Sequence, residues 1–113
     1  MKIAIFTDTY PPFINGVSTS AYNLVKTLKE HGHDVIVVTP RSDDGKLELI
    51  DGIIRVPGFE LKKMYGYRIT TLYSRKIIQM LKDFGTEIIH NQTDIGIGQF
   101  ARIAARQLHV PQV

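Results

Sequence analysis

The chain has 113 residues, of which 43% are apolar and none is cysteine, and its formal net charge is +3. This length and composition fit one domain with its own core, and we expect the chain to be neither disordered nor multidomain. The absence of cysteine excludes disulfides and thiolate chemistry and suits a reducing, cytoplasmic compartment. No apolar stretch is long enough to span a bilayer, and Met1 leads straight into an apolar run without a secretory signal pattern. Any membrane contact is therefore expected to be peripheral.

The positive charge is concentrated in residues 55–82, which hold seven basic residues and one acidic residue, whereas the rest of the chain carries −3. A basic stretch of this density favours an anionic partner, either a lipid surface or nucleic acid; a merely solvated face is the alternative. No nucleic-acid recognition motif accompanies the charge. We therefore expect no nucleic-acid partner.

The first third of the chain predicts a strand, a helix and a second strand. Residues 3–6 form an apolar run that is typical of a strand buried on both faces. Apolar side chains then recur at helical spacing, at Val17, Ala21, Leu24, Val25 and Leu28. Gly32 is predicted to end this helix, and the β-branched residues 34–39 predict a parallel strand that Pro40 terminates. Together these elements predict a βαβ unit.

A hairpin and a helix are predicted next. Asp51-Gly52 lies between the apolar runs 47–50 and 53–56, which predicts a two-residue hairpin turn at the edge of the sheet. Residues 58–67 show no period and predict a mobile loop. Helical spacing resumes at Ile69 and continues to Phe84, where Gly85 is predicted to end the helix.

The last part of the chain repeats the alternation of strand and helix. Residues 87–90 predict a short strand, and residues 91–94 predict a loop in which Asp94 caps the next helix. The apolar spacing from Ile97 to Leu108 predicts that helix. Residues 110–113 are predicted to open a further strand.

This order of elements predicts an α/β fold, a doubly wound sheet of mainly parallel strands. With the hairpin at one edge, the strands follow in the order hairpin, 34–39, 3–6 and 87–90. The winding then reverses between the last two strands, and ligands bind at such a reversal, beyond the carboxyl ends of the strands. Residues 8–16 and 90–94 are therefore predicted to meet at one crevice.

The crevice loops carry few recognisable motifs. Neither G-x-G-x-x-G nor the P-loop pattern is present. Gly16 either lets a phosphate approach the start of the helix or serves a turn that needs positive φ. His90, at a strand end, can orient a substrate hydroxyl or act as a base, or it can be structural. No other ligand side chain is suitably spaced around it, so no metal is expected.

Two stretches carry a family resemblance. Residues 5–17 read IFTDTYPPFINGV, and Leu24, Leu28, Gly32-His33, Val35 and Thr39 follow at the expected positions. This pattern resembles the amino terminus of retaining glycosyltransferases of family 4. Residues 88–94 (IIHNQTD) with Gly98, and residues 105–111 (ARQLHVP), are similar to the family's next two segments. Many members have two glycines where this chain has Asn15-Gly16, and this departure resembles the branch that glucosylates diacylglycerol.

The resemblance implies a GT-B fold, in which two Rossmann-like domains hold the donor nucleotide mainly in the second and the acceptor in the first. Residues 1–113 would form the acceptor-side domain, incomplete at its C-terminal end, with the family's catalytic histidine beyond Val113. Asn15 and Gly16 would approach the donor diphosphate. The acceptor-side residues would be Asp8, Thr9, Tyr10, His90, Asn91, Gln92, Thr93 and Asp94. A nucleotide sugar such as UDP-glucose is the implied co-substrate, with no cofactor and no metal.

The family also implies a peripheral membrane surface on this domain, and the basic stretch has that character. Its expected contacts are Lys62, Lys63, Arg68, Arg75 and Lys76. We therefore predict the N-terminal part of a retaining enzyme that moves a hexose, with glucose favoured, to a membrane lipid such as diacylglycerol on the inner face of the cell membrane. This chain alone is not expected to be active. The alternative is a non-catalytic α/β module that binds anionic lipid or a protein partner.

Overall fold

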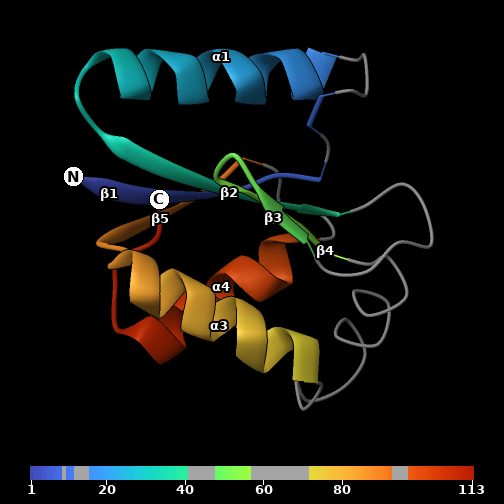
Figure 1. Cartoon of the computed structure of the whole chain (residues 1–113), viewed down its shortest axis with the longest axis vertical. Coiled ribbons are helices and arrows are strands. Elements are labelled where there is room, and N and C mark those ends of the chain that lie inside the picture. The colour runs from blue at the N-terminus through green and yellow to red at the C-terminus, as the bar shows by residue number, and fades with distance from the viewer. Residues whose placement is uncertain (9, 12–15, 41–47, 57–71, 93–96) are drawn as a thin grey trace.

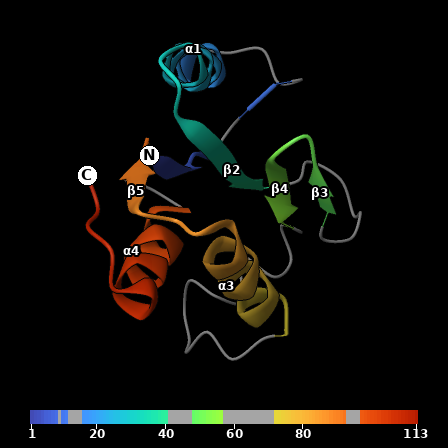
Figure 2. The same cartoon turned by 60° about the vertical axis from the view of Figure 1, so that its left-hand side comes forward.

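The computed structural model describes residues 1–8, 10–11, 16–40, 48–56, 72–92 and 97–113. Helices cover both faces of a central sheet, with α1 on one face and α3 and α4 on the other (Figure 1; Figure 2). In chain order the elements are β1 (Lys2–Phe6), α1 (Gly16–Glu30), β2 (Asp34–Pro40), β3 (Glu48–Ile50), β4 (Ile53–Val56), α3 (Leu72–Phe84), β5 (Ile88–Asn91) and α4 (Ile97–Leu108). The alternation of strands and helices confirms the predicted α/β class.

The strands follow the predicted order. In the described part of the chain the sheet has five strands in the order β3-β4-β2-β1-β5. β1 pairs in parallel with β2 and β5, and β2 pairs in parallel with β4. Residues 110–113 extend the sheet beyond β5, where Val113 N donates to Ile89 O at 2.9 Å and Gln112 forms a parallel bridge to Ile89. The predicted further strand therefore begins there.

The hairpin is confirmed at the opposite edge. β3 pairs antiparallel with β4, with Ile50 opposite Ile53. Asp51 has φ 54° and Gly52 has φ 76°, and two positive φ values in succession are those of a type I′ turn. The Asp-Gly pair suits this turn because both residue types tolerate the left-handed region.

Two apolar clusters hold the layers together. On the α1 face, Ile5 and Val37 of the sheet pack with Ala21 and Val25 of the helix. On the other face, a larger cluster joins β1, β2, β4 and β5 to α3 and α4. Within it, the Phe6 and Phe100 rings meet edge to face with centroids 5.7 Å apart, and both side chains are fully buried. The sheet is thus buried on both faces, as its near-continuous apolar strands predict.

Some boundaries differ from the sequence prediction. Pro40 is the last residue of β2 rather than the residue after it, and Asn91 closes β5 rather than opening the next loop. α3 is described from Leu72, so the predicted start at Ile69 lies outside the described residues. Positive φ at Gly32 (86°) and Gly85 (82°) ends α1 and α3 as predicted. The predicted mobile loop at 58–67 lies outside the described residues.

Candidate functional site

The winding of the sheet reverses between β1 and β5, which lie side by side. Their carboxyl ends are joined directly, because Gln92 N, just after β5, donates to Phe6 O, the last residue of β1, at 2.8 Å. α1 leaves this edge toward one face and α4 toward the other (Figure 2). Asp8, which follows β1, and Gln92, which follows β5, therefore lie at the same edge of the sheet.

Asp8 contacts the beginning of α4. Its Oδ1 accepts a hydrogen bond from Ile97 N, the first residue of that helix, at 2.9 Å. The first N–H groups of a helix have no partner within the helix, so this carboxylate caps α4 from a different segment. Sequence spacing predicted a local cap at Asp94, which lies outside the described residues. Nothing in the sequence pairs Asp8 with a residue 89 positions later.

Replacement of Asp8 tests this contact. We expect Asp8→Ala to lower the free energy of unfolding by about 1–2 kcal/mol, because the N–H of Ile97 loses its partner. Asp8→Asn should cost less, since an amide oxygen can accept the same bond and only the favourable charge at the helix N-terminus is lost. Urea unfolding measures both, with exposed Asp34→Ala as the control. An Asp8→Ala protein as stable as that control contradicts the capping role.

A chain of side-chain hydrogen bonds connects β5 to α1. His90 Nε2 lies 2.8 Å from Gln92 Oε1, and Gln92 Nε2 donates to Ser20 Oγ at 3.2 Å. His90 and Gln92 are among the predicted site residues, and the structure brings them together. Ser20 was not predicted, because a serine in a helix gives no sequence signal of a partner 72 residues away.

Gly16 is the first residue of α1 and is exposed. Its φ is not positive, so Gly16 does not serve a turn that needs positive φ, which was one of its two predicted roles. Among the described residues, nothing lies within 4 Å of a Cβ built at this position. Neither its backbone conformation nor a described neighbour therefore requires glycine at this position.

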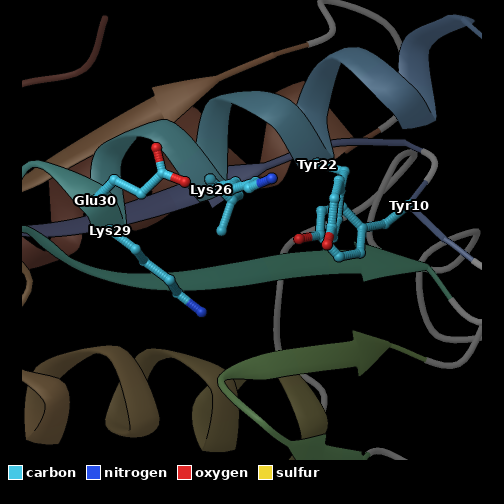
Figure 3. Close-up of a pocket in the computed structure, with 6 residues that line it drawn as sticks. Tyr10, Tyr22, Lys26, Lys29 and Glu30 are labelled. Carbon is cyan, nitrogen blue, oxygen red and sulfur yellow. The ribbon is translucent and has the colours of Figure 1, made fainter.

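Tyr10 faces a different space from the other predicted residues. It lines a pocket of about 350 Å³ along α1, whose other lining residues are Tyr22, Val25, Lys26, Lys29 and Glu30 (Figure 3). The Tyr10 side chain is 5% exposed, and its ring centroid lies 6.3 Å from that of Tyr22. The pocket extends to Glu30 at the end of the helix, and among the described residues of the predicted site Tyr10 alone lines it.

Burial affects the pKa of the Tyr10 hydroxyl. Desolvation raises the pKa of Tyr10, and Tyr22 adds to the rise, while the positive charge of Arg55 opposes it. Arg55 itself is held nearby, since its Nη2 donates to Pro11 O at 2.6 Å. The Tyr10 hydroxyl is thus protonated at neutral pH and keeps its ability to donate a hydrogen bond.

The remaining predicted residues divide into described and undescribed positions. Thr9, Asn15, Thr93 and Asp94 lie outside the described residues. Asn91 is partly buried at the end of β5, and its Oδ1 has no partner among the described residues. Within the described part of the chain, no group of three or more histidine, cysteine or acidic residues is placed to hold a metal ion.

Two of the five predicted membrane contacts can be placed. Arg75 and Lys76 are exposed on α3, whereas Lys62, Lys63 and Arg68 lie outside the described residues. On the same helix, Ile77 and Leu81 are fully buried in the core, which leaves the cationic side chains at the surface. Among the described helices, none is long and apolar enough to cross a membrane.

A doubly wound α/β domain, whose strand order reverses between β1 and β5, belongs to the Rossmann-like class of folds. The comparison with known families narrows this class: the model of glycosyltransferase family 4 matches residues 14–113, and the chain belongs to that family. The arrangement is consistent with the N-terminal half of a GT-B fold.

Characterised relatives match the entire chain. It is 31% identical to an alpha-monoglucosyldiacylglycerol synthase of Acholeplasma laidlawii and 32% identical to one of Streptococcus pneumoniae, spanning 29% and 26% of their lengths. It is also 29% identical to a GDP-mannose-dependent alpha-mannosyltransferase of Corynebacterium glutamicum, spanning 28% of that protein. The chain thus corresponds to less than a third of each of these relatives, at their N-terminal part.

Proposed function

We propose that the chain is the acceptor-side domain of a retaining glycosyltransferase that moves glucose from a nucleotide sugar to a diacylglycerol lipid. The observation that carries this proposal is its similarity, over all its residues, to two synthases named for monoglucosyldiacylglycerol. Retention follows from the same names together with general chemistry. UDP-glucose carries its sugar in α linkage, so a transfer that yields an alpha-glucosyl product preserves the configuration at the anomeric carbon.

The arrangement at the strand reversal suits this reaction. Gly16 opens α1 without a described side chain nearby, and the first turn of that helix has no acidic residue. Unpaired N–H groups at a helix N-terminus favour a phosphate, which is the part of the donor proposed to lie here beside Asn15. His90 and Gln92, across the β1–β5 junction, are proposed to belong to the acceptor side of the site.

The competing assignment within the family is a mannosyltransferase, because three relatives are named GDP-mannose-dependent alpha-mannosyltransferases. The glucosyl assignment is preferred, since both synthases named for monoglucosyldiacylglycerol are slightly more similar to the chain, at 31% and 32% identity against 29–30% for the three mannosyltransferases. The proposed membrane partner is an anionic leaflet contacted by Lys62, Lys63, Arg68, Arg75 and Lys76. A peripheral position on the inner face of the cell membrane belongs to the same proposal.

Transfer assays with the full-length protein test the proposal. We expect it to glucosylate diacylglycerol in mixed vesicles with UDP-glucose, and to yield an α-linked glycolipid by NMR of the anomeric proton. GDP-mannose is the matched donor control and should give little product. Efficient mannosyl transfer would contradict the glucosyl assignment, and a β-linked product would contradict retention. No transfer from any nucleotide sugar, with vesicle binding preserved, would favour a non-catalytic lipid-binding module.

A further inference from the structure

His90 projects from β5 on the side of the sheet that α1 covers. Side chains alternate between the faces of a strand, so Ile88 and His90 share one face and Ile89 occupies the other. Ile88 packs with the cluster beneath α1, whereas Ile89 belongs to the cluster beneath α3 and α4. The imidazole therefore lies on the same face as α1, and this placement lets a single side chain join it to the helix.

Gln92 is that side chain, and its backbone is also fixed. Its N–H donates to Phe6 O at 2.8 Å, which ties the residue to the end of β1. Its amide then spans the distance between two elements, with Oε1 at 2.8 Å from His90 Nε2 and Nε2 at 3.2 Å from Ser20 Oγ. One residue thus links β1, β5 and α1 at the point where the strand order reverses.

The hydrogen bonds define which ring nitrogen of His90 carries a proton. As the Gln92 amide is oriented here, its oxygen faces the ring and can only accept, so His90 Nε2 donates to Gln92 Oε1. In the neutral ring, Nδ1 then keeps its lone pair and is the acceptor. No residue in the described part of the chain bonds to Nδ1, which leaves this atom available to a substrate hydroxyl.

Ser20 connects this arrangement to the proposed donor side. It follows Gly16 by four residues, which is about one helical turn, so the two lie on the same side of α1. The hydrogen-bonded series from His90 through Gln92 to Ser20 consequently ends one turn from the helix N-terminus. A shift of α1 relative to β5 would stretch or break these bonds.

We propose that Gln92 is a positioning residue for acceptor binding, which holds the His90 ring with its proton on Nε2 and its Nδ1 ready to accept a hydrogen bond from the acceptor hydroxyl. Ser20 holds the other end of the Gln92 amide against α1. The inference rests on the proposed function for its substrate, whereas the state of the ring can be observed without any substrate.

The first measurement concerns the ring itself. In protein labelled with ¹⁵N in its histidine rings, the Nε2 proton of His90 should give a resonance protected from exchange with water, identified by its loss in His90→Asn. Gln92→Met has similar length but cannot accept a hydrogen bond, so it should remove the protection. Gln92→Glu should retain it, because one carboxylate oxygen can accept from His90 and the other from the Ser20 hydroxyl. Gln107→Met, at an exposed position of α4, is the matched control.

The second measurement concerns acceptor use by the full-length protein. We expect Gln92→Met to lower kcat/KM for the acceptor about tenfold while the KM for the donor changes less than about twofold, a pattern that loss of folded protein does not produce. Ser20→Ala should act in the same direction by about threefold, and the double variant should be no worse than Gln92→Met alone, because the two residues act through one contact. Gln92→Glu should restore most of the lost acceptor use.

The outcomes separate this inference from the proposed function. A His90 Nε2 proton that remains protected in Gln92→Met, or acceptor kinetics equal to those of Gln107→Met, overturns the positioning role even if the protein transfers glucose. The wild-type protein could transfer no sugar although its Nε2 proton is protected and Gln92→Met removes that protection. This result would contradict both the proposed function and the acceptor role of Nδ1. Gln92 is then confirmed only as the residue that orients the ring.

Discussion

Gly16→Val is expected to lower glycosyl transfer by the full-length protein at least about tenfold, which corresponds to about 1.4 kcal/mol of transition-state stabilisation. The valine side chain would occupy the open space at the N-terminus of α1, where the donor diphosphate is proposed to lie. Stability should not fall, because valine is a better helix former than glycine and Gly16 does not need positive φ. Thermal melting and steady-state turnover measure the two effects separately.

Two matched variants make this result decisive. Gly16→Ala adds a single methyl group and should give a smaller loss of activity. Thr19→Val places a β-branched apolar side chain at an exposed position in the same part of α1, and it should leave turnover unchanged. A Gly16→Val protein that melts at much lower temperature, yet is fully active in its folded fraction, assigns Gly16 to local structure instead of ligand binding.

Neutralising five basic residues is expected to abolish binding to anionic vesicles. Each lysine or arginine close to an anionic surface contributes on the order of 1 kcal/mol, so Lys62, Lys63, Arg68, Arg75 and Lys76 together supply about 5 kcal/mol before the entropy of adsorption. Their replacement by glutamine should therefore prevent co-sedimentation with vesicles that contain phosphatidylglycerol. High salt should have the same effect on the unmodified protein, because screening shortens the reach of the field.

A control variant tests whether vesicle binding depends on where the positive charges lie and not only on the net charge of the protein. A control in which Lys26, Lys29, Arg102 and Arg106 become glutamine removes exposed charges from α1 and α4 and leaves the basic stretch intact. This control should still bind. Binding that survives the five substitutions, or that is equally strong on neutral phosphatidylcholine vesicles, contradicts the electrostatic surface. Preferential binding to RNA in competition would identify nucleic acid as the partner.

Much of the fold could be predicted because its signals are local. Continuous apolar runs identified the buried strands β1 and β2, and Asp51-Gly52 identified the hairpin that forms one edge. From these elements and the general preference for right-handed crossovers, the strand order and its reversal followed. Element boundaries were less exact, as at Asn91, because hydrogen bonds to a neighbouring strand extend β5 by one residue.

The contacts within the site could not be predicted in the same way. Asp8 caps a helix that begins 89 residues later, and Ser20 bonds to a side chain 72 residues away. Such partners are set by how elements pack in space, and neither periodicity nor spacing records them. Tyr10 illustrates the reverse: its position after β1 placed it in the predicted site, whereas its side chain lines the pocket along α1.

The carboxylate of Asp8 makes the N-termini of α1 and α4 differ in their electrostatics. A helix N-terminus normally attracts anions, but at α4 a negatively charged side chain already occupies that place and bonds to Ile97 N. The N-terminus of α1 has no acidic residue in its first turn. In the proposed function, the N-terminus of α1 would attract the donor diphosphate and the carboxylate of Asp8 would repel it. We therefore expect the phosphates of a bound sugar nucleotide to lie against α1 and away from Asp8.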